Sequence, residues 1–255
     1  MNFNLYLFRS TAENSQRVIL TQVIFGVLST IYFLLTQQYI YFLYAIILYF
    51  TIGEFLQNVA LHRYFAHNSF TTNKFWHSFM AIFSPLACAG SPLAYSLAHR
   101  THHLYSDTEK DPSYTKMGFL KVAFFRWNLE HVPSNVLRSL QRDKWVMFSH
   151  NYYVLILIVF WLILFSINFK LALVFNVTGL FIFLAYCLVN IGNHSKLPFS
   201  YRNYETKDNS RNDIITGYLY GEWHNNHHRY PTRWNQKEKW WELDIPAQII
   251  KLIKK

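Results

Sequence analysis

Nine clustered histidines are the residues of this chain best suited to chemistry. Six of them form two triplets with one spacing, H-x-x-H-H: His99, His102 and His103 in H-R-T-H-H, and His224, His227 and His228 in H-N-N-H-H. With 12 histidines in 255 residues, chance predicts only about 0.03 motifs of this kind, so two copies indicate a shared purpose. Because neutral imidazole is the commonest metal ligand in proteins, the pattern predicts bound metal.

Helical geometry explains how these spacings place ligands. In H-x-x-H-H the first histidine is three and four positions from the others, so all three side chains lie on one helical face and can serve two neighbouring metals. His62 and His67, in H-R-Y-F-A-H, are five residues apart, or about 140° around an ideal helix, which predicts that they straddle a helix end. His194 follows Asn190 by one turn, and that pair shares a face.

The composition indicates a membrane protein. The chain is 52% hydrophobic, 19% aromatic and only 15% charged, which is typical of membrane rather than soluble proteins. Four apolar segments approach the ~20 residues that a helix needs to cross a bilayer. They are residues 18–35, 39–56, 152–167 and 171–189, with Glu54 as their only charged residue.

The connections between these segments predict the topology. Three residues, 36–38, join the first pair, and three residues, 168–170, join the second, so each pair should be an antiparallel hairpin. Both turns then face one side of the membrane, and segments 57–151 and 190–255 share the other side with all nine histidines. We expect an all-α fold of one domain, residues 1–255, with four transmembrane helices in two hairpins and a cytosolic helical cap.

The distribution of charge predicts the orientation. Of the 24 Lys and Arg residues only Lys170 lies on the side of the turns, so the positive-inside rule places the histidines and both termini in the cytoplasm. This topology, together with anionic lipid headgroups, explains the net charge of +10, and we expect no nucleic-acid binding. Cys88 and Cys187 lie in apolar stretches, so we expect small buried side chains without a redox role.

Two segments outside the spans leave the arrangement more open. Residues 75–95 are apolar but contain Pro85, Gly90 and Pro92, which predicts a broken helix in the interface or dipping into the protein. The tail, residues 246–255, follows Trp240 and Trp241. It is equally suited to a short helix on the membrane surface and to packing against the cytosolic domain.

The order of the histidine motifs resembles that of a known family. The order H-x4-H, H-x-x-H-H, single His after the fourth span, H-x-x-H-H is similar to that of integral-membrane fatty acid desaturases of the stearoyl-CoA (delta-9) type, over nearly the whole chain. The flanking residues strengthen the resemblance. They are H-R-Y-F-A-H-N-S-F from His62, H-R-T-H-H-L-Y-S-D-T-E-K-D-P from His99, and G-E-W-H-N-N-H-H-R-Y-P from Gly221.

The resemblance implies a di-iron centre and an O2-dependent reaction. Two irons, for which zinc is a possible substitute in purified protein, would be bound by nine histidines, and Asn190 would reach one iron through water. The implied ligands are His62, His67, His99, His102, His103, His194, His224, His227 and His228. The implied reaction inserts a cis double bond into a long-chain acyl substrate, either acyl-CoA or acyl-lipid, in the membrane, with electrons from a separate donor such as ferredoxin or cytochrome b5.

Residues beside the ligands add further expectations. A metal-bound imidazole commonly donates its other N–H to a carboxylate, and the candidates are Asp107, Glu109, Asp111 and Glu222. Two features depart from the family pattern. Leu97-Ala98 stands where acyl-CoA members carry Arg-Asp, which leaves CoA recognition in question. Arg126 lies near a position where the family places basic residues, although an Arg in an interfacial segment more often contacts a lipid headgroup. Glu54, Gln57 and Asn58 stand where the family favours small residues, which suggests an altered substrate.

Two other classes of protein compete with the desaturase interpretation. A sister di-iron oxygenase, such as a membrane hydroxylase or a carotenoid oxygenase, shares similar histidine motifs. A metal transporter or metal-binding membrane protein is the non-enzyme alternative. Transporters place ionisable ligands near the bilayer midplane, whereas these histidines lie at span ends and in cytosolic segments, which disfavours the transporter.

Overall fold

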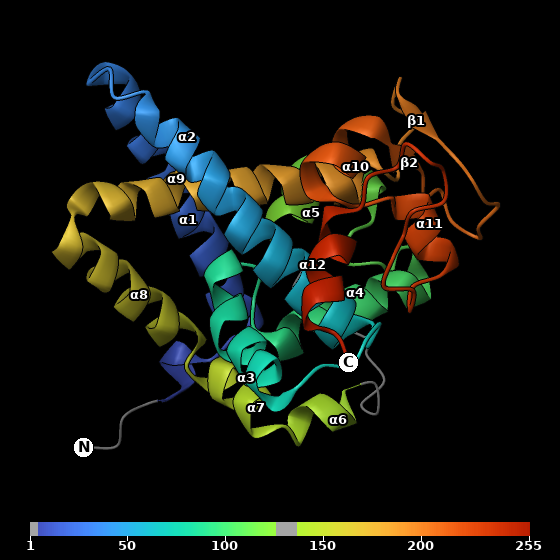
Figure 1. Cartoon of the computed structure of the whole chain (residues 1–255), viewed down its shortest axis with the longest axis horizontal. Helices are drawn as coiled ribbons and strands as arrows, with labels where there is room; N and C mark the ends of the chain where they lie inside the picture. The colour runs from blue at the N-terminus through green and yellow to red at the C-terminus, as the bar shows by residue number, and fades with distance from the viewer. Residues whose placement is uncertain (1–4, 126–136) are drawn as a thin grey trace.

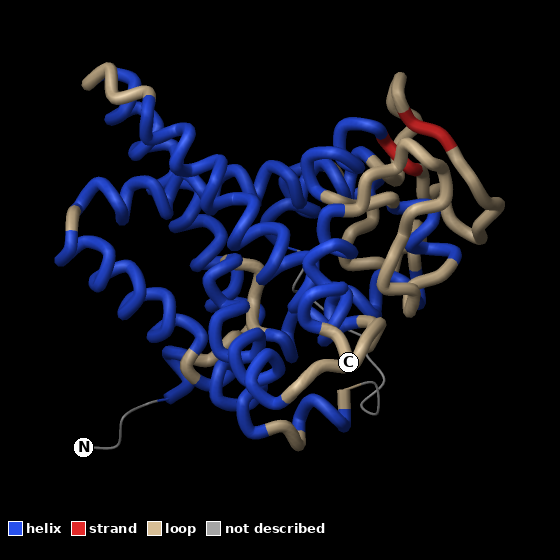
Figure 2. The backbone as a smooth tube through the Cα atoms, viewed as in Figure 1, coloured by secondary structure: helices blue, strands red, loops and turns tan. Residues whose placement is uncertain are grey.

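The computed structural model describes residues 5–125 and 137–255, and Arg126 lies outside them. The described chain is mostly helical, with loops and one short strand pair gathered on one side (Figures 1 and 2). Long helices extend to one side of the molecule, and shorter helices and loops, which include the histidine motifs, gather on the other (Figure 1).

The long helices give three candidate membrane spans. They are α1 (Ala12–Leu35), α2 (Ile40–Tyr49) continued by the π-helix η2 (Phe50–Ala66), and α9 (Phe169–Cys187) continued by the π-helix η5 (Leu188–Gly192). Two bent pairs meet the same criterion only when each is counted as one span. They are α3 (Lys74–Phe83) with η3 (Ser84–Ala87) and α4 (Pro92–Tyr105), bent by 75°, and α7 (Lys144–Asn151) with α8 (Tyr153–Ile167), bent by 73°.

Short turns join the long helices as expected, although the helix bounds differ from the apolar segments. α1 begins before residue 18 because the Thr11 side chain accepts a hydrogen bond from the Asn14 backbone N–H and caps the helix. The second long helix continues past residue 56 to Ala66. Its polar side chains there are buried in protein, so the helix persists where the apolar segment ends.

The central helix α9 positions the other long helices. α1, α2 and α8 all pack against it, and α8 connects to it through Asn168 alone, whose side chain accepts a hydrogen bond from the Lys170 backbone N–H. Close packing against α9 uses glycine at Gly179. A Cβ added there would lie 2.0 Å from Nε2 of Gln22 on α1.

The predicted break between residues 75 and 95 is confirmed. α3 ends at Phe83, and α4 begins at Pro92 with the Ser91 side chain as its N-cap. Between the two helices, Cys88 and Gly90 adopt positive φ angles of 55° and 88°. Because the whole connection from Ser84 to Ser91 is buried, the broken helix dips into the protein.

The remaining described elements are short helices and one pair of short strands. They are η1 (Leu5–Phe8), η4 (Thr115–Met117), α5 (Phe119–Phe125), α6 (Arg138–Gln141), β1 (Ser200–Tyr201), β2 (Asn212–Asp213), α10 (Ile214–Tyr220), α11 (His224–Arg229) and α12 (Ile245–Ile253). The all-α expectation did not include the small antiparallel pair β1–β2, in which Ser200 faces Asp213. Arg211, which precedes β2, links the two strands by donating hydrogen bonds to the side chain and carbonyl of Ser200.

The C-terminal tail packs against the protein. Ile250 and Ile253 of α12 are buried in a cluster with Val59 and Met80. Arg63, with 1% of its surface exposed, donates hydrogen bonds to Asp244 and to the carbonyls of Trp234 and Gly221. Of the two arrangements proposed for the tail, packing on the domain is the one observed.

Candidate metal centre

Four segments bring the nine clustered histidines to one place. His62 lies in η2 and His67 caps its end, so the pair straddles a helix end as predicted. Because the His67 backbone N–H donates to the carbonyl of His62, a hydrogen bond of the π-helical i to i+5 type, residues five apart are stacked above one another. α4 and α11 each contribute one H-x-x-H-H triplet, and His194 follows η5.

The first histidine group contains five imidazoles whose Nε2 atoms face one another. They belong to His62, His67, His99, His103 and His227. Nε2 of His99 lies 2.7 Å from that of His67 and 3.1 Å from that of His103. Nε2 of His227 lies 2.8 Å from that of His103 and 3.0 Å from that of His62. Ring nitrogens from η2, α4 and α11 therefore converge.

The second histidine group contains four imidazoles. They belong to His102, His194, His224 and His228, and each offers a ring nitrogen within 4.8 Å of the other three. Nε2 of His194 lies 2.9 Å from that of His224, and Nε2 of His102 lies 3.3 Å from that of His228. Each H-x-x-H-H triplet thus serves both groups.

The spacing of the ring nitrogens fits two metal ions. Two imidazole nitrogens bound at right angles to a metal, each at about 2.1 Å, lie about 3 Å apart. The observed Nε2–Nε2 distances of 2.7 to 3.3 Å bracket this value. A neutral imidazole carries one ring hydrogen, and wherever Nδ1 donates it outward, Nε2 presents a lone pair to the centre. The residues present therefore fit a pair of metals.

Burial keeps the α11 imidazoles neutral. Burial, and then the neighbouring histidines, hold the pKa of His224 and of His227 well below the usual value. Burial also lowers the pKa of His228 to about 4, although the hydrogen bond with Asp208 raises it. These side chains are unprotonated at neutral pH, as metal ligands must be.

Carboxylates hold the outer nitrogens of the second group. Nδ1 of His102 lies 2.9 Å from Oδ1 of Asp111, and Nδ1 of His194 lies 3.1 Å from Oδ2 of Asp107. Nδ1 of His224 faces Oε1 of Glu222 at 3.4 Å. Three of the four carboxylates expected from the sequence thus lie beside ligand candidates. Glu109, the fourth, is exposed on the following loop.

A further carboxylate, Asp208, also holds the second group, and no local sequence pattern predicts it. Oδ2 of Asp208 lies 2.7 Å from Nδ1 of His228. Burial would raise the pKa of Asp208, but hydrogen bonds from His228 and Ser210 lower it below the usual range of a carboxyl. Asp208 lies in the loop between β1 and β2 with no histidine near it in sequence, so only the fold brings it here.

The polar residues of η2 have different surroundings. Asn58, which sequence reasoning did not assign to the centre, places Oδ1 3.2 Å from Nδ1 of His62 and donates from Nδ2 to the carbonyl of Tyr220. It orients a ligand candidate. Glu54 and Gln57 are fully buried, and their side-chain polar atoms have no hydrogen-bond partner within the described part of the chain.

Paired asparagines fix the position of α11. The Asn212 side-chain oxygen accepts hydrogen bonds from the backbone N–H groups of Asn225 and Asn226. Asn225 in turn accepts from the backbone of Asn203, and Asn226 donates to Glu242. The two residues between the histidines of H-N-N-H-H therefore anchor the short helix that carries three ligand candidates.

Asn190 borders a small cavity beside the histidines. The cavity has a volume of about 20 Å³, and His99 and His102 also line it. Such a volume holds about one water molecule. Asn190 donates from Nδ2 to the carbonyl of Tyr186, which fixes its amide beside the cavity. A water-bridged contact from Asn190 to a metal stays a prediction.

The fold and the site together define a class: this is a helical membrane protein with a histidine centre suited to metal. Comparison with known proteins identifies the family. Residues 37–248 match the family model of the fatty acid desaturases. An sn-1 stearoyl-lipid 9-desaturase of Anabaena variabilis is 31% identical over 218 residues, covering 82% of this chain and 79% of that protein. The enzyme of the same name from Synechocystis sp. is 31% identical over 221 residues, covering 82% and 67%.

A plant protein gives the same result. Delta-9 acyl-lipid desaturase 2 of Arabidopsis thaliana is 30% identical over 227 residues, which cover 82% of this chain and 70% of that protein. The chain belongs to the fatty acid desaturase family, and the resemblance to delta-9 desaturases is confirmed. It is an oxidoreductase that desaturates fatty acids in the biosynthesis of unsaturated fatty acids.

Proposed function

We propose that the two histidine groups bind two iron ions, which make this chain an O2-dependent acyl desaturase. The observation that carries the proposal is the convergence of imidazole Nε2 atoms from η2, α4, α11 and the end of η5. Because such ligands bind zinc more tightly than ferrous iron, zinc is expected to replace some iron during purification.

The chain's own residues position these ligands rather than carry out the reaction. Desaturation removes hydrogen from C–H bonds that have no useful acidity, so side-chain acids and bases do not suffice. A bound iron pair would supply oxygen activation, and the separate electron donor would supply two electrons. Asp107, Asp111, Asp208 and Glu222 hold the outer imidazole nitrogens, which fixes the direction of the inner ones. Water within the small cavity would bridge Asn190 to the second group.

The proposed substrate is a long-chain acyl group carried on a membrane lipid, with a cis double bond introduced at carbon 9. The names of the bacterial and plant relatives specify stearoyl-lipid or acyl-lipid substrates and position 9. Leu97-Ala98 supports a lipid carrier over CoA, since an apolar pair replaces the Arg-Asp of acyl-CoA members.

We further propose four spans in two hairpins, with the histidines and both termini in the cytoplasm. The short α1–α2 and α8–α9 turns support the hairpins, and the confinement of nearly all Lys and Arg residues to one side supports the orientation. The basic cytosolic face favours an acidic electron carrier, such as a ferredoxin or a cytochrome b5, as a separate partner.

Expression in a host with a known fatty acid profile tests this function. Wild-type protein should produce a new cis-monounsaturated acyl species, whereas His227→Ala should produce none because it removes a member of the first group. His77→Ala is the matched control, since His77 pairs with Asp143 and Tyr64 away from the centre, and it should retain the product. Purified wild type should contain about two metal ions per chain.

Two results would contradict the proposal. A hydroxylated lipid or an oxidised carotenoid in place of the unsaturated product would identify a sister oxygenase. If active protein contained one metal ion or none per chain, the proposal of a di-iron centre would be wrong. If the product appears on CoA thioesters before it appears on lipids, the acyl carrier is CoA and the interpretation of Leu97-Ala98 is wrong.

A further inference from the structure

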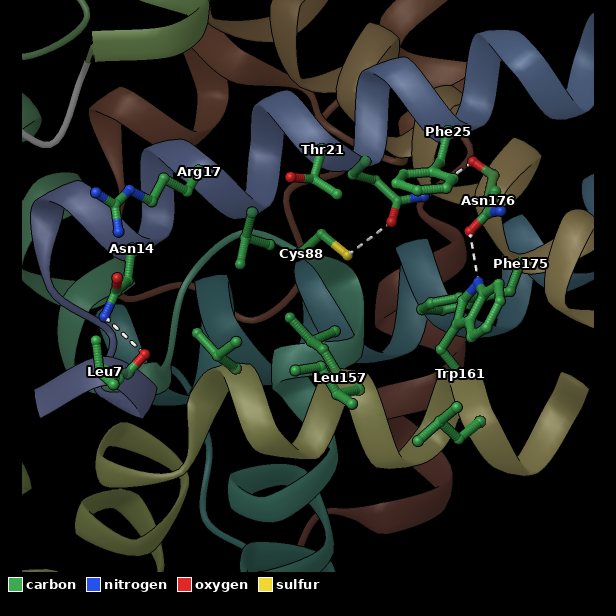
Figure 3. A pocket seen from close by; sticks show the side chains of 15 residues that line it. Leu7, Asn14, Arg17, Thr21, Phe25, Cys88, Leu157, Trp161, Phe175 and Asn176 are labelled. Atoms are coloured by element: carbon green, nitrogen blue, oxygen red, sulfur yellow. Dashed lines mark hydrogen bonds between the residues drawn. The ribbon is translucent and has the colours of Figure 1, made fainter. Parts of the chain in front are cut away.

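A second site lies on α1, away from the histidines. A groove of about 460 Å³ runs between α1, α8 and α9, and the side chains of Val18, Thr21, Leu157 and Trp161 line it (Figure 3). Pockets that hold small molecules have volumes of roughly 300–1,000 Å³, so the groove is large enough for a ligand. No clustered histidine contributes to it.

The rim of the groove faces the surroundings of the long helices. Phe25, Ile158 and Leu162 line it with exposed fractions of 47%, 46% and 53%. α1 is a candidate membrane span, and α8 belongs to a bent candidate pair. In a bilayer these side chains contact hydrocarbon, which excludes water, so an acyl chain is the chemical group available to fill the apolar part of the groove.

One end of the groove is polar and cationic. Asn14 and Arg17, from the first two turns of α1, line this end. Arg17 is largely exposed and donates to Glu13 through Nη2, whereas a guanidinium has five N–H donors. Arg17 is the charged residue that lines this end of the groove; its ion-pair partner Glu13 does not line it, and the remaining guanidinium N–H groups can donate to a ligand. This polarity complements an anionic headgroup joined to an acyl chain.

A polar wall separates the groove from the metal side. Gln22 lies across Gly179 and donates from Nε2 to the carbonyl of Asn176 at 2.9 Å. Its Oε1 accepts from the Cys88 thiol at 3.6 Å, along the dashed line that starts at Cys88 in Figure 3. The cavity on the other side of Gln22 measures about 20 Å³, too little for an acyl chain. A ligand of the groove therefore does not extend to the histidines.

We propose that this groove binds one anionic phospholipid as a resident ligand rather than as substrate. Its phosphate lies at Arg17, and one acyl chain runs past Val18 and Leu157 toward Trp161. Asn14 does not bind the phosphate, because its Nδ2 donates to the carbonyls of Tyr6, Leu7 and Arg9. Since α1 and α8 both pack against α9 and border the groove, the lipid joins the two helices. The groove is distinct from the site that desaturates acyl chains, and the lipid bound in the groove is not chemically converted.

Photocrosslinking of the metal-loaded full chain in detergent tests the proposal. The probe is phosphatidylglycerol with a diazirine at the middle of one acyl chain, and peptides with adducts are identified by mass spectrometry. Adducts should concentrate on α1 and α8 residues that line the groove. Thr21→Trp fills the groove and should reduce this labelling about tenfold, which corresponds to about 1.4 kcal/mol. Leu20→Trp is the matched control, because Leu20 is exposed on α1 outside the groove.

A second variant tests the headgroup without filling the groove. Arg17→Gln should remove the preference for phosphatidylglycerol over phosphatidylcholine with the same chains, while Lys170→Gln, at the α8–α9 turn, should leave it intact. Equal labelling of wild type and Thr21→Trp would overturn the proposal, because the lipid would then be bulk annular lipid. If Arg17→Gln kept the preference for phosphatidylglycerol over phosphatidylcholine, the proposal that the groove binds an anionic headgroup would be wrong. Consumption of the saturated probe by the wild type that Thr21→Trp abolishes and Leu20→Trp leaves intact would make the groove a substrate site.

Discussion

A histidine side chain has two ring nitrogens, and in this protein the two have separate tasks. The inner Nε2 atoms face one another across the two groups, and outer Nδ1 atoms in the second group meet carboxylates. Asp208 illustrates the second task, because its Oδ2 lies 2.7 Å from Nδ1 of His228. A carboxylate in this position fixes the ring and increases the basicity of the inner nitrogen.

Replacing Asp208 tests the importance of the outer contact. Asp208→Ala removes the acceptor of the His228 Nδ1 hydrogen, so we expect metal affinity at the second group to fall by roughly 10–100-fold while the first group stays filled. Metal analysis after dialysis against graded chelator measures both. Glu205→Ala is the control, because Glu205 lies in the same loop, is exposed, and pairs with Arg202. If Asp208→Ala and Glu205→Ala lost the same amount of metal, the cause would be a change in the loop rather than the lost contact with His228.

Helix ends and breaks decide which element carries each ligand. The sequence pattern predicted that His62 and His67 straddle a helix end and that the segment around Pro85 and Gly90 breaks, because both features have local causes. The π-helical turn that aligns His62 with His67 could not be predicted, since the pattern was judged on an ideal α-helix. The split of each H-x-x-H-H triplet between the groups also depends on contacts between distant segments.

The contact between η2 and the C-terminal region is equally non-local. Arg63 follows a ligand candidate in sequence, yet its guanidinium lies against Asp244, and no local pattern links the two. The same limit applies to the groove, where Gln22 lies over Gly179 on α9. Sequence periodicity indicates which residues are buried but does not identify the partner of a buried polar side chain.

Removing Arg63 should destabilise the protein strongly. Arg63→Ala leaves the buried Asp244 without its charged partner, and breaking one side of a buried pair costs about 3–5 kcal/mol. Thermal unfolding in detergent, followed by aggregation or thiol labelling, should show a clear loss. Arg233→Ala is the control, since its exposed pair with Glu238 contributes about 0–1 kcal/mol. A double variant, Arg63→Ala with Asp244→Ala, should recover part of the loss, and failure to recover would show that the carbonyl contacts dominate.

The whole molecule separates an apolar half from a histidine half. α1, α2, α8 and α9 expose large apolar side chains, such as Leu28 and Ile47, whereas all nine clustered histidines lie where η2, α4, η5 and α11 meet. The family and the histidine positions were predictable from sequence alone, because both depend on residue types at fixed spacing. The number of spans was not, since the bends at α3–α4 and α7–α8 decide whether each pair counts as one crossing.

Reporter fusions test the four-span arrangement at the scale of the molecule. Because only Lys170 of the 24 basic residues lies near a hairpin turn, we expect a fusion after Lys255 to be active with a cytoplasmic reporter and inactive with a reporter that needs export. Insertions at Gln37 and at Asn168 should give the opposite result, since both turns face away from the histidines. An insertion at Lys116, in the segment between the hairpins, should match the C-terminal fusion. If Lys116 instead reports the same side as Gln37, the α3–α4 pair crosses the membrane as a fifth span, which would place the Asn168 turn in the cytoplasm and Lys255 on the opposite side.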